Sequence, residues 1–149
     1  MVDKTTKRFI RNETDDKAAR AGFKMDLKRA GHVVSFFSKY LRHTMGQWAG
    51  QPIELMKWQK EELLKRLFGW VHKDTGLRRF RTAYIEVPKK NGKSTLCSGL
   101  ALYLLAADGE PGAQVYCAAA SRDQAAIVYR EASKMAQDSP LLNDYVLAR

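Results

Sequence analysis

The sequence has few of the residues from which disulfide frameworks and metal sites are built. Its 149 residues include two cysteines, three histidines and four prolines. Cys97 and Cys117 form no CxxC pair, and the histidines are scattered without the spacing of zinc ligands. We therefore expect two reduced cysteines in a cytosolic core, and neither a disulfide scaffold nor a zinc module.

Long apolar runs are also missing. No stretch approaches the roughly 20 apolar residues that span a bilayer, and residues 1–4 lead into charge instead of an apolar signal region. We expect no membrane span and no secretory signal. The remaining composition, 45% hydrophobic and 28% charged, is that of a globular domain with a real core.

Positive charge is abundant and unevenly placed. The formal net charge is +10. Residues 1–38 carry nine Lys and Arg against five Asp and Glu, residues 39–93 thirteen against five, and residues 94–149 four against six. A basic N-terminal half fits a polyanionic partner such as nucleic acid, and the solvated face of a helical domain explains it equally well.

Hydrophobic periodicity predicts helices in the first half of the chain. Early acids and late bases predict a helix over 15–30, weakened by Gly22 and stopped at Gly31. A second helix is predicted over 32–43. Its apolar side consists of Val33, Phe36, Phe37 and Leu41.

A loop is predicted over 44–54, followed by an amphipathic helix over 55–71. The apolar positions of this helix are Leu55, Trp58, Leu63, Leu67 and Trp70. We place a domain boundary between residues 54 and 55, so that residues 1–54 form a helical, basic N-terminal region.

The second half reads as strand, loop, helix, strand and helix. Strand composition occurs at 82–87 and 114–119, a nearly all-apolar helix at 93–107, and an amphipathic helix at 121–137. This order predicts an α/β fold that begins a right-handed βαβ array with a parallel sheet.

The loop between the first strand and the apolar helix has the sequence VPKKNGKST, typical of a phosphate-binding P-loop. Backbone N–H groups at a helix N-terminus hold phosphate oxygens, aided by the helix dipole. In this reading Lys93 reaches the β- and γ-phosphates, and the Ser94 hydroxyl binds Mg²⁺. The predicted ligands are ATP and Mg²⁺, and the predicted nucleotide-binding residues are Pro88, Lys89, Lys90, Asn91, Gly92, Lys93, Ser94 and Thr95.

The loop departs from the consensus GxxxxGK[ST] at its first position. Val87 stands where the consensus has glycine, and Pro88 removes one backbone donor. The entry into the loop must therefore differ from the usual one, and Lys89 and Lys90 add charge that compensates. The alternative interpretation is a lysine-rich turn with Asn91 near the helix N-cap.

Several motifs in sequence order carry a family resemblance. Trp58-Gln59, the run FGW…TGLRRFRTAYIEVPKKNGKSTL and the later VYCAAASRDQA resemble the large terminase subunit of tailed bacteriophages and prophages, in its HK97-like branch. The similarity extends from about Trp48 to the C-terminus. The order of the motifs is more specific than any one of them.

This resemblance implies an ATPase domain of the RecA-like P-loop type, incomplete over 55–149, and a separate RNase H-like nuclease domain. ATP hydrolysis would drive double-stranded DNA into a procapsid. The implied partners are double-stranded DNA, a small terminase subunit and the portal, in a homo-oligomeric ring. The implied location is the cytoplasm of a bacterial host, with no membrane association.

The acidic residues of this family's active sites are not found in the sequence. We find no Walker B acidic pair, no catalytic glutamate and no acidic nuclease cluster, and Asp123 and Asp144 are isolated. We therefore expect a partial terminase, either a fragment of a working motor or a truncated prophage remnant, with no ATPase activity alone.

Other residues have both a functional and a structural interpretation. Gln59 is placed to read the adenine edge, or is a surface glutamine beside a core tryptophan. Ser121 and Gln124 form a capping box, with a functional role near ATP or DNA as the alternative. Arg122 suits an arginine finger in a ring, although a surface role is favoured.

The densest basic cluster is Arg78, Arg79 and Arg81, which either contacts a DNA backbone or a neighbouring subunit, or lies in a solvated turn. Aromatic side chains are interpreted as core residues in preference to base-stacking platforms. They are Trp48, Trp58, Phe68 and Trp70.

Three alternatives for the whole chain stay open. It is a fragment of another, helicase-like P-loop ATPase, a basic nucleic-acid-binding module without catalysis, or an inert prophage remnant.

Overall fold

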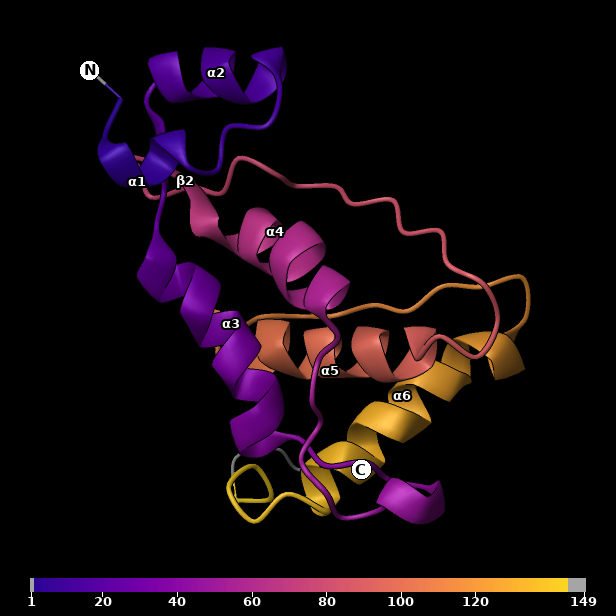
Figure 1. The fold of residues 1–149 in the computed structure, drawn as a ribbon. Helices are drawn as coiled ribbons and strands as arrows, with labels where there is room; N and C mark the ends of the chain where they lie inside the picture. Colours follow the sequence, from indigo (N-terminus) through magenta and orange to yellow (C-terminus); the bar gives the residue numbers. More distant parts are fainter. Residues whose placement is uncertain (1, 145–149) are drawn as a thin grey trace. The chain divides into compact units, whose positions relative to one another are not determined.

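The computed structural model describes residues 2–144, which form a mixture of helices and short strands (Figure 1). In chain order the elements are α1 (Lys4–Lys7), α2 (Glu13–Arg20), β1 (Phe23–Met25), α3 (Leu27–Tyr40), η1 (Gly46–Trp48), η2 (Gln59–Leu64), α4 (Lys65–Gly69), β2 (Trp70–His72), α5 (Lys93–Ala106) and α6 (Arg122–Gln137).

Contacts divide the chain into two compact units, each made of two segments. The first unit comprises the residues up to Val34 together with Leu55–Ile85. The second unit comprises Ser35–Glu54 and the residues from Glu86 onward. The predicted phosphate loop therefore belongs to the second unit.

An antiparallel ribbon of β1 and β2 organises the first unit. Met25 pairs with Trp70, and the Trp70 side chain is fully buried in a cluster with Met25, Ala19 and Ala30. Neither strand was predicted, because each has only three residues. Such strands depend on pairing across the chain and not on a local pattern.

The single helix predicted over 15–30 is wrong, because β1 separates residues 15–20 of α2 from residues 27–30 of α3. Gly22 has φ +97°, a left-handed conformation that ends the helical segment. The chain then enters β1 and restarts as α3 at Leu27. Gly31, predicted as a stop, lies inside α3. The apolar side predicted for the second helix is confirmed as buried, and it consists of Val33, Phe36, Phe37 and Leu41.

The predicted helix over 55–71 is confirmed in part, but its buried face is shifted. Residues Gln59–Leu64 form a π-helix, and the helix ends at Gly69. The wider π turn brings Gln59 and Leu64, five residues apart, into the core. Periodicity of 3.6 residues had instead placed Leu63 and Leu67 on the apolar face, and both are only half-buried.

The second unit is built around α5, whose prediction is confirmed. Its buried residues are Leu96, Ser98, Gly99, Leu102 and Tyr103. Gly99 allows close packing, because a Cβ there would meet the Phe37 ring and lie 2.8 Å from Leu41 Cδ1. The Tyr103 and Phe36 rings meet edge to face, with centroids 5.4 Å apart. The predicted helix α6 is also confirmed.

The strands predicted over 82–87 and 114–119 are wrong for the described chain. Both segments lack strand pairing, and Tyr84 and Tyr116 in them are 88% and 84% exposed. Strand-forming side chains do not make a strand unless the backbone finds a hydrogen-bonding partner, and residues 2–144 place no strand beside either segment. The mixed α and β class is confirmed.

Candidate phosphate-binding site

The candidate site begins where the extended chain turns into α5. Gly92 is the N-cap residue of α5, with φ 68° and ψ 24°, and no side chain caps this end. The first helical bond runs from the Leu96 N–H to the Gly92 carbonyl. The N–H groups of the first turn have no acceptor within an α-helix, so the N-terminus of α5 offers donors to an anion.

The loop makes its turn without a glycine at its first position. Lys90 has φ 66°, and in the part of the chain that the structure describes no other non-glycine residue has a positive φ. The Asn91 amide donates to the carbonyls of Pro88 and Lys89, each at 3.3 Å. The loop therefore turns through a left-handed lysine, next to an asparagine whose side chain bonds the preceding carbonyls.

Lys93 folds back over the loop. Its Nζ donates to the Val87 carbonyl at 2.6 Å, which links the first residue of the loop to the first residue of α5. The side chains of Lys89, Lys90 and Lys93 are all exposed. Three cations around an uncapped helix N-terminus favour a polyphosphate in electrostatic terms.

The two hydroxyl residues after Lys93 face different surroundings. Ser94 is exposed at the start of α5. The Thr95 hydroxyl instead donates to Glu131 Oε1 of α6 at 2.6 Å. The side chain of Ser94 is thus available to a metal-bound phosphate, whereas that of Thr95 is committed to packing between helices.

Gln59 lies in the first unit, where it is almost completely buried, with 6% of its surface exposed. Its Oε1 accepts the Met56 N–H at 2.7 Å, so the amide caps the start of its own helix. Its amino group is the end that remains for an adenine contact. The predicted adenine-reading role stays a prediction.

The arginine cluster has two different environments. Arg79 is not solvated, because its Nη1 donates to Asp15 at 2.6 Å and its guanidinium lies 4.9 Å from the Trp70 ring centroid. Asp15 also accepts from Arg66 at 2.9 Å. Arg78 lies over the Phe68 ring, and only Arg81 is exposed.

The remaining predictions have mixed outcomes. The Ser121 hydroxyl accepts the Gln124 N–H at 3.3 Å, which confirms the N-cap of α6. Arg122 is exposed at that end. Phe68 and Trp70 are confirmed as buried, and Trp58 is half-buried. The prediction of Trp48 as a core residue is wrong, because its side chain lies in the short η1 turn and is 55% exposed.

Carboxylates suited to a metal are sparse. Residues 2–144 contain no group of three His, Cys, Asp or Glu side chains that could hold an ion. A magnesium ion at this loop would depend on the Ser94 hydroxyl and on phosphate oxygens. The loop thus offers helix N–H groups and lysine side chains to phosphate oxygens, and the Ser94 hydroxyl to a metal.

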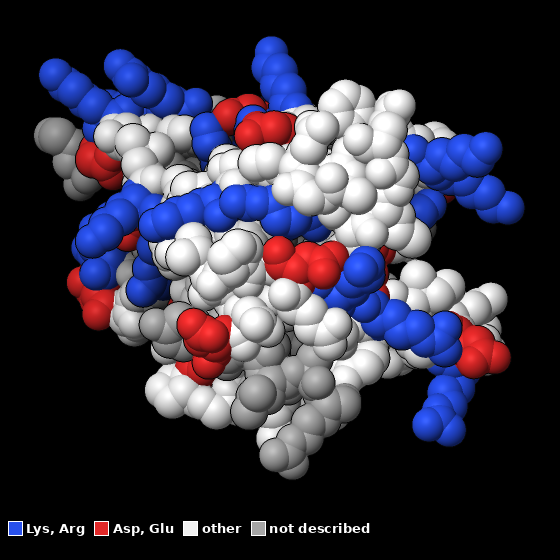
Figure 2. Space-filling view, turned by 90° about the horizontal axis from the view of Figure 1, so that it is seen from below, with Lys and Arg blue, Asp and Glu red and all other residues white. Residues whose placement is uncertain are grey.

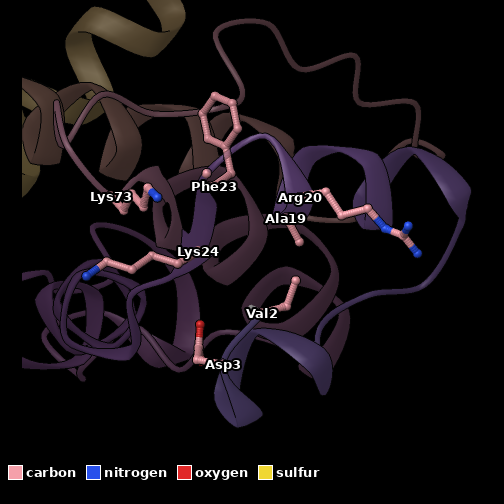
Figure 3. A pocket seen from close by; sticks show the side chains of 8 residues that line it. Val2, Asp3, Ala19, Arg20, Phe23, Lys24 and Lys73 are labelled. Atoms are coloured by element: carbon pink, nitrogen blue, oxygen red, sulfur yellow. The ribbon is translucent and has the colours of Figure 1, made fainter.

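A second hollow, of about 280 Å³, lies in the first unit. Its polar groups do not converge on a ligand: the charged ends of Arg20 and Lys24 point in opposite directions (Figure 3). Asp3 is engaged in capping α1 through the N–H and hydroxyl of Thr6. The phosphate loop therefore remains the stronger site.

Comparison with known proteins assigns the chain to a family. The family described as terminase large subunit, ATPase domain, matches residues 57–145, more than half of the chain and all of the loop. The chain belongs to this family. It is also 30% identical over 121 residues to the terminase large subunit of Enterobacteria phage HK97, which covers 80% of the present chain.

The family assignment extends only to part of a terminase. The chain spans 23% of the length of the HK97 protein. No solved structure matches the chain. Within residues 2–144 no helix is both long and apolar enough to cross a membrane.

Proposed function

We propose that residues 88–95 bind the phosphate groups of ATP, and that this chain is the ATP-binding N-terminal part of a phage DNA-packaging motor. The observation that carries the proposal is the Lys93 side chain, which closes the loop onto the Val87 carbonyl at an uncapped helix N-terminus. Membership of the terminase ATPase family supports the same ligand.

The roles of the loop residues follow from their positions. The exposed N–H groups at Gly92, Lys93 and Ser94 would hold phosphate oxygens, because they begin a helix whose dipole is positive at this end. Lys93 would leave the Val87 carbonyl, a neutral acceptor, and donate to a charged phosphate oxygen, which forms a stronger hydrogen bond. Lys89 and Lys90 would add charge at the rim of the loop.

Magnesium is proposed as the partner of the nucleotide, held on the protein side by Ser94. Bound to phosphate, the ion would neutralise charge on the oxygens that the loop faces. The gamma-phosphate chemistry also requires an acid to hold the metal and a base to orient water. We propose that those groups belong to the rest of a complete terminase.

The wider functions are proposals from the family as well. They are translocation of double-stranded DNA, assembly with a small subunit and the portal, formation of a homo-oligomeric ring, and a cytoplasmic location in a bacterial host. We likewise propose an incomplete RecA-like P-loop domain over 55–149 and a helical region over 1–54. Gln59 is proposed to contact adenine through its amino group.

Nucleotide binding tests the central proposal. The affinity of a fluorescent ATP analogue, measured with Mg²⁺ by titration, should fall at least tenfold in Lys93→Ala, because a charged phosphate contact is lost. Lys89→Ala is the matched control, since it removes the same charge from the rim and should weaken binding by about threefold or less. Equal effects of the two substitutions would show that only nonspecific charge attracts the nucleotide.

A further inference from the structure

Two polar contacts join α5 to α6 just behind the phosphate loop. The Thr95 hydroxyl donates to Glu131 Oε1 at 2.6 Å, and the Ser98 hydroxyl donates to the Val128 carbonyl at 3.0 Å. Thr95 and Ser98 lie one turn apart on α5, and Val128 and Glu131 lie one turn apart on α6. The two hydrogen bonds lie one helical turn apart, and the one nearer the loop has a carboxylate as its acceptor.

The Thr95–Glu131 hydrogen bond lies in the first turn of α5, the turn that is proposed to bind phosphate. Thr95 is the third residue of α5, directly after Lys93 and Ser94. The N–H groups of this turn have no helical acceptors, so only the placement of the turn determines where they point. The hydrogen bond from the Thr95 hydroxyl holds this turn to α6.

The Glu131 carboxylate also acts electrostatically on α5. Cys97 and Cys117 were expected in the core, but both are exposed. Partial desolvation nevertheless raises the pKa of the Cys97 thiol, and the neighbouring Cys117 and the Glu131 charge raise it further. Cys97 lies two residues after Thr95. The half-buried Glu131 carboxylate thus lies beside the start of α5, where it accepts from Thr95.

We infer that Glu131 is a positioning residue for the phosphate loop, which holds the first turn of α5 through the Thr95 hydroxyl and so couples phosphate binding to α6. This inference rests on the proposed function. Glu131 makes no contact with phosphate itself; it acts through Thr95.

A double-mutant cycle tests the coupling. The affinity for N-methylanthraniloyl-ADP with Mg²⁺ is measured in the full chain, in Thr95→Val, in Glu131→Ala and in the double variant. Each single substitution should weaken binding about three- to tenfold, because a charge-assisted hydrogen bond is lost. The double variant should be no weaker than the weaker single one. Thr95→Ser keeps the hydroxyl and should retain affinity within about twofold of the unaltered chain.

Ser98→Ala is the matched structural control. It removes the hydrogen bond from Ser98 to the Val128 carbonyl, which joins the same two helices one turn further from the loop. The melting temperature should fall, and the nucleotide affinity should stay within about twofold of that of the unaltered chain. The inference is overturned if Thr95→Val and Ser98→Ala weaken binding equally, or if the two single effects add in the double variant. Absence of Lys93-dependent binding in the unaltered chain would instead overturn the proposed function, and this inference with it.

Discussion

At the scale of single residues, Asp15 is a buried carboxylate that the sequence analysis did not select. Its carboxylate, 1% exposed, accepts from both Arg66 and Arg79, and also from the Arg11 N–H at 3.0 Å. These bonds join α2 to α4 and to the chain after β2. One carboxylate therefore holds together segments of the first unit that are more than 50 residues apart in sequence.

Removing this carboxylate should destabilise the first unit strongly. Asp15→Ala leaves two nearly buried guanidinium groups without their acceptor, so we expect a loss of about 3–5 kcal/mol in the free energy of unfolding. Urea denaturation measures this change. The neighbouring Asp16 pairs with Arg20 in solvent, so Asp16→Ala should cost less than about 1 kcal/mol. Similar losses in the two variants would contradict the buried role of Asp15.

Acid should abolish the contribution of Asp15. Burial disfavours its charged form, but the hydrogen bonds from Arg66 and Arg79 outweigh burial and hold the pKa of Asp15 below its usual value. A carboxyl with a lowered folded-state pKa stabilises the fold above its unfolded-state pKa, near 3.8, and the contribution disappears as pH falls below that value.

The measurement is urea denaturation of the unaltered chain and of Asp15→Asn between pH 7 and pH 2.5. The difference in the free energy of unfolding should be constant above about pH 5 and should shrink below about pH 4. A difference that is the same at both ends of this range would show that the charge of Asp15 does not stabilise the fold.

At the scale of elements, the two longest helices of the second unit differ in how they are specified. Helix α6 has a local start signal, the Ser121 cap, and an amphipathic pattern. Helix α5 is apolar almost all round and has no cap, so its position depends on what packs against it. At Gly99 this packing is too close to admit a Cβ.

Two glycine-to-alanine substitutions should have opposite effects on stability. At Gly99 the added methyl would overlap the Phe37 ring, so Gly99→Ala should destabilise the chain by about 1–3 kcal/mol. At Gly31, inside α3, a Cβ meets nothing within 4 Å, so Gly31→Ala should stabilise it by about 0.5–1 kcal/mol. Melting temperatures measure both changes, and two shifts of the same sign would contradict the packing assigned to Gly99.

At the scale of the whole molecule, the excess of positive charge dominates. The net charge is +10, and Figure 2 shows many Lys and Arg side chains extending into solvent on one face. Arg66 and Arg79 are nearly buried, because Asp15 binds them. Other cations, among them Lys17 and Arg20, form ion pairs that stay exposed to solvent. The exposed cations together attract a polyanion.

Duplex DNA should bind this surface through its phosphates. The logarithm of the binding constant should fall linearly with the logarithm of salt concentration, with a slope of about −0.9 for each phosphate contacted. Lys93→Ala should leave this binding within about twofold, because one of many exposed cations is lost. Filter binding between 50 and 200 mM salt measures it; loss of DNA binding in Lys93→Ala would place DNA and nucleotide on one site.

The structural features that depend on residues close together in the sequence could largely be predicted from it. The apolar helix α5 behind an NGKST loop, the capped α6 and the buried side of α3 are all local patterns of spacing and side-chain type. Motif order was also sufficient to indicate the terminase family, because it depends on residue identity along the chain and not on contacts.

Tertiary structure decided the features that join distant residues or that depend on the backbone. The β1–β2 ribbon, the arginine pair around Asp15 and the Thr95–Glu131 bond each connect segments that no local pattern relates. The left-handed Lys90 and the π turn at Gln59 are backbone conformations that residue type does not specify. Strand-forming composition at 82–87 had no effect without a neighbouring strand, because a strand exists only through hydrogen bonds to a partner.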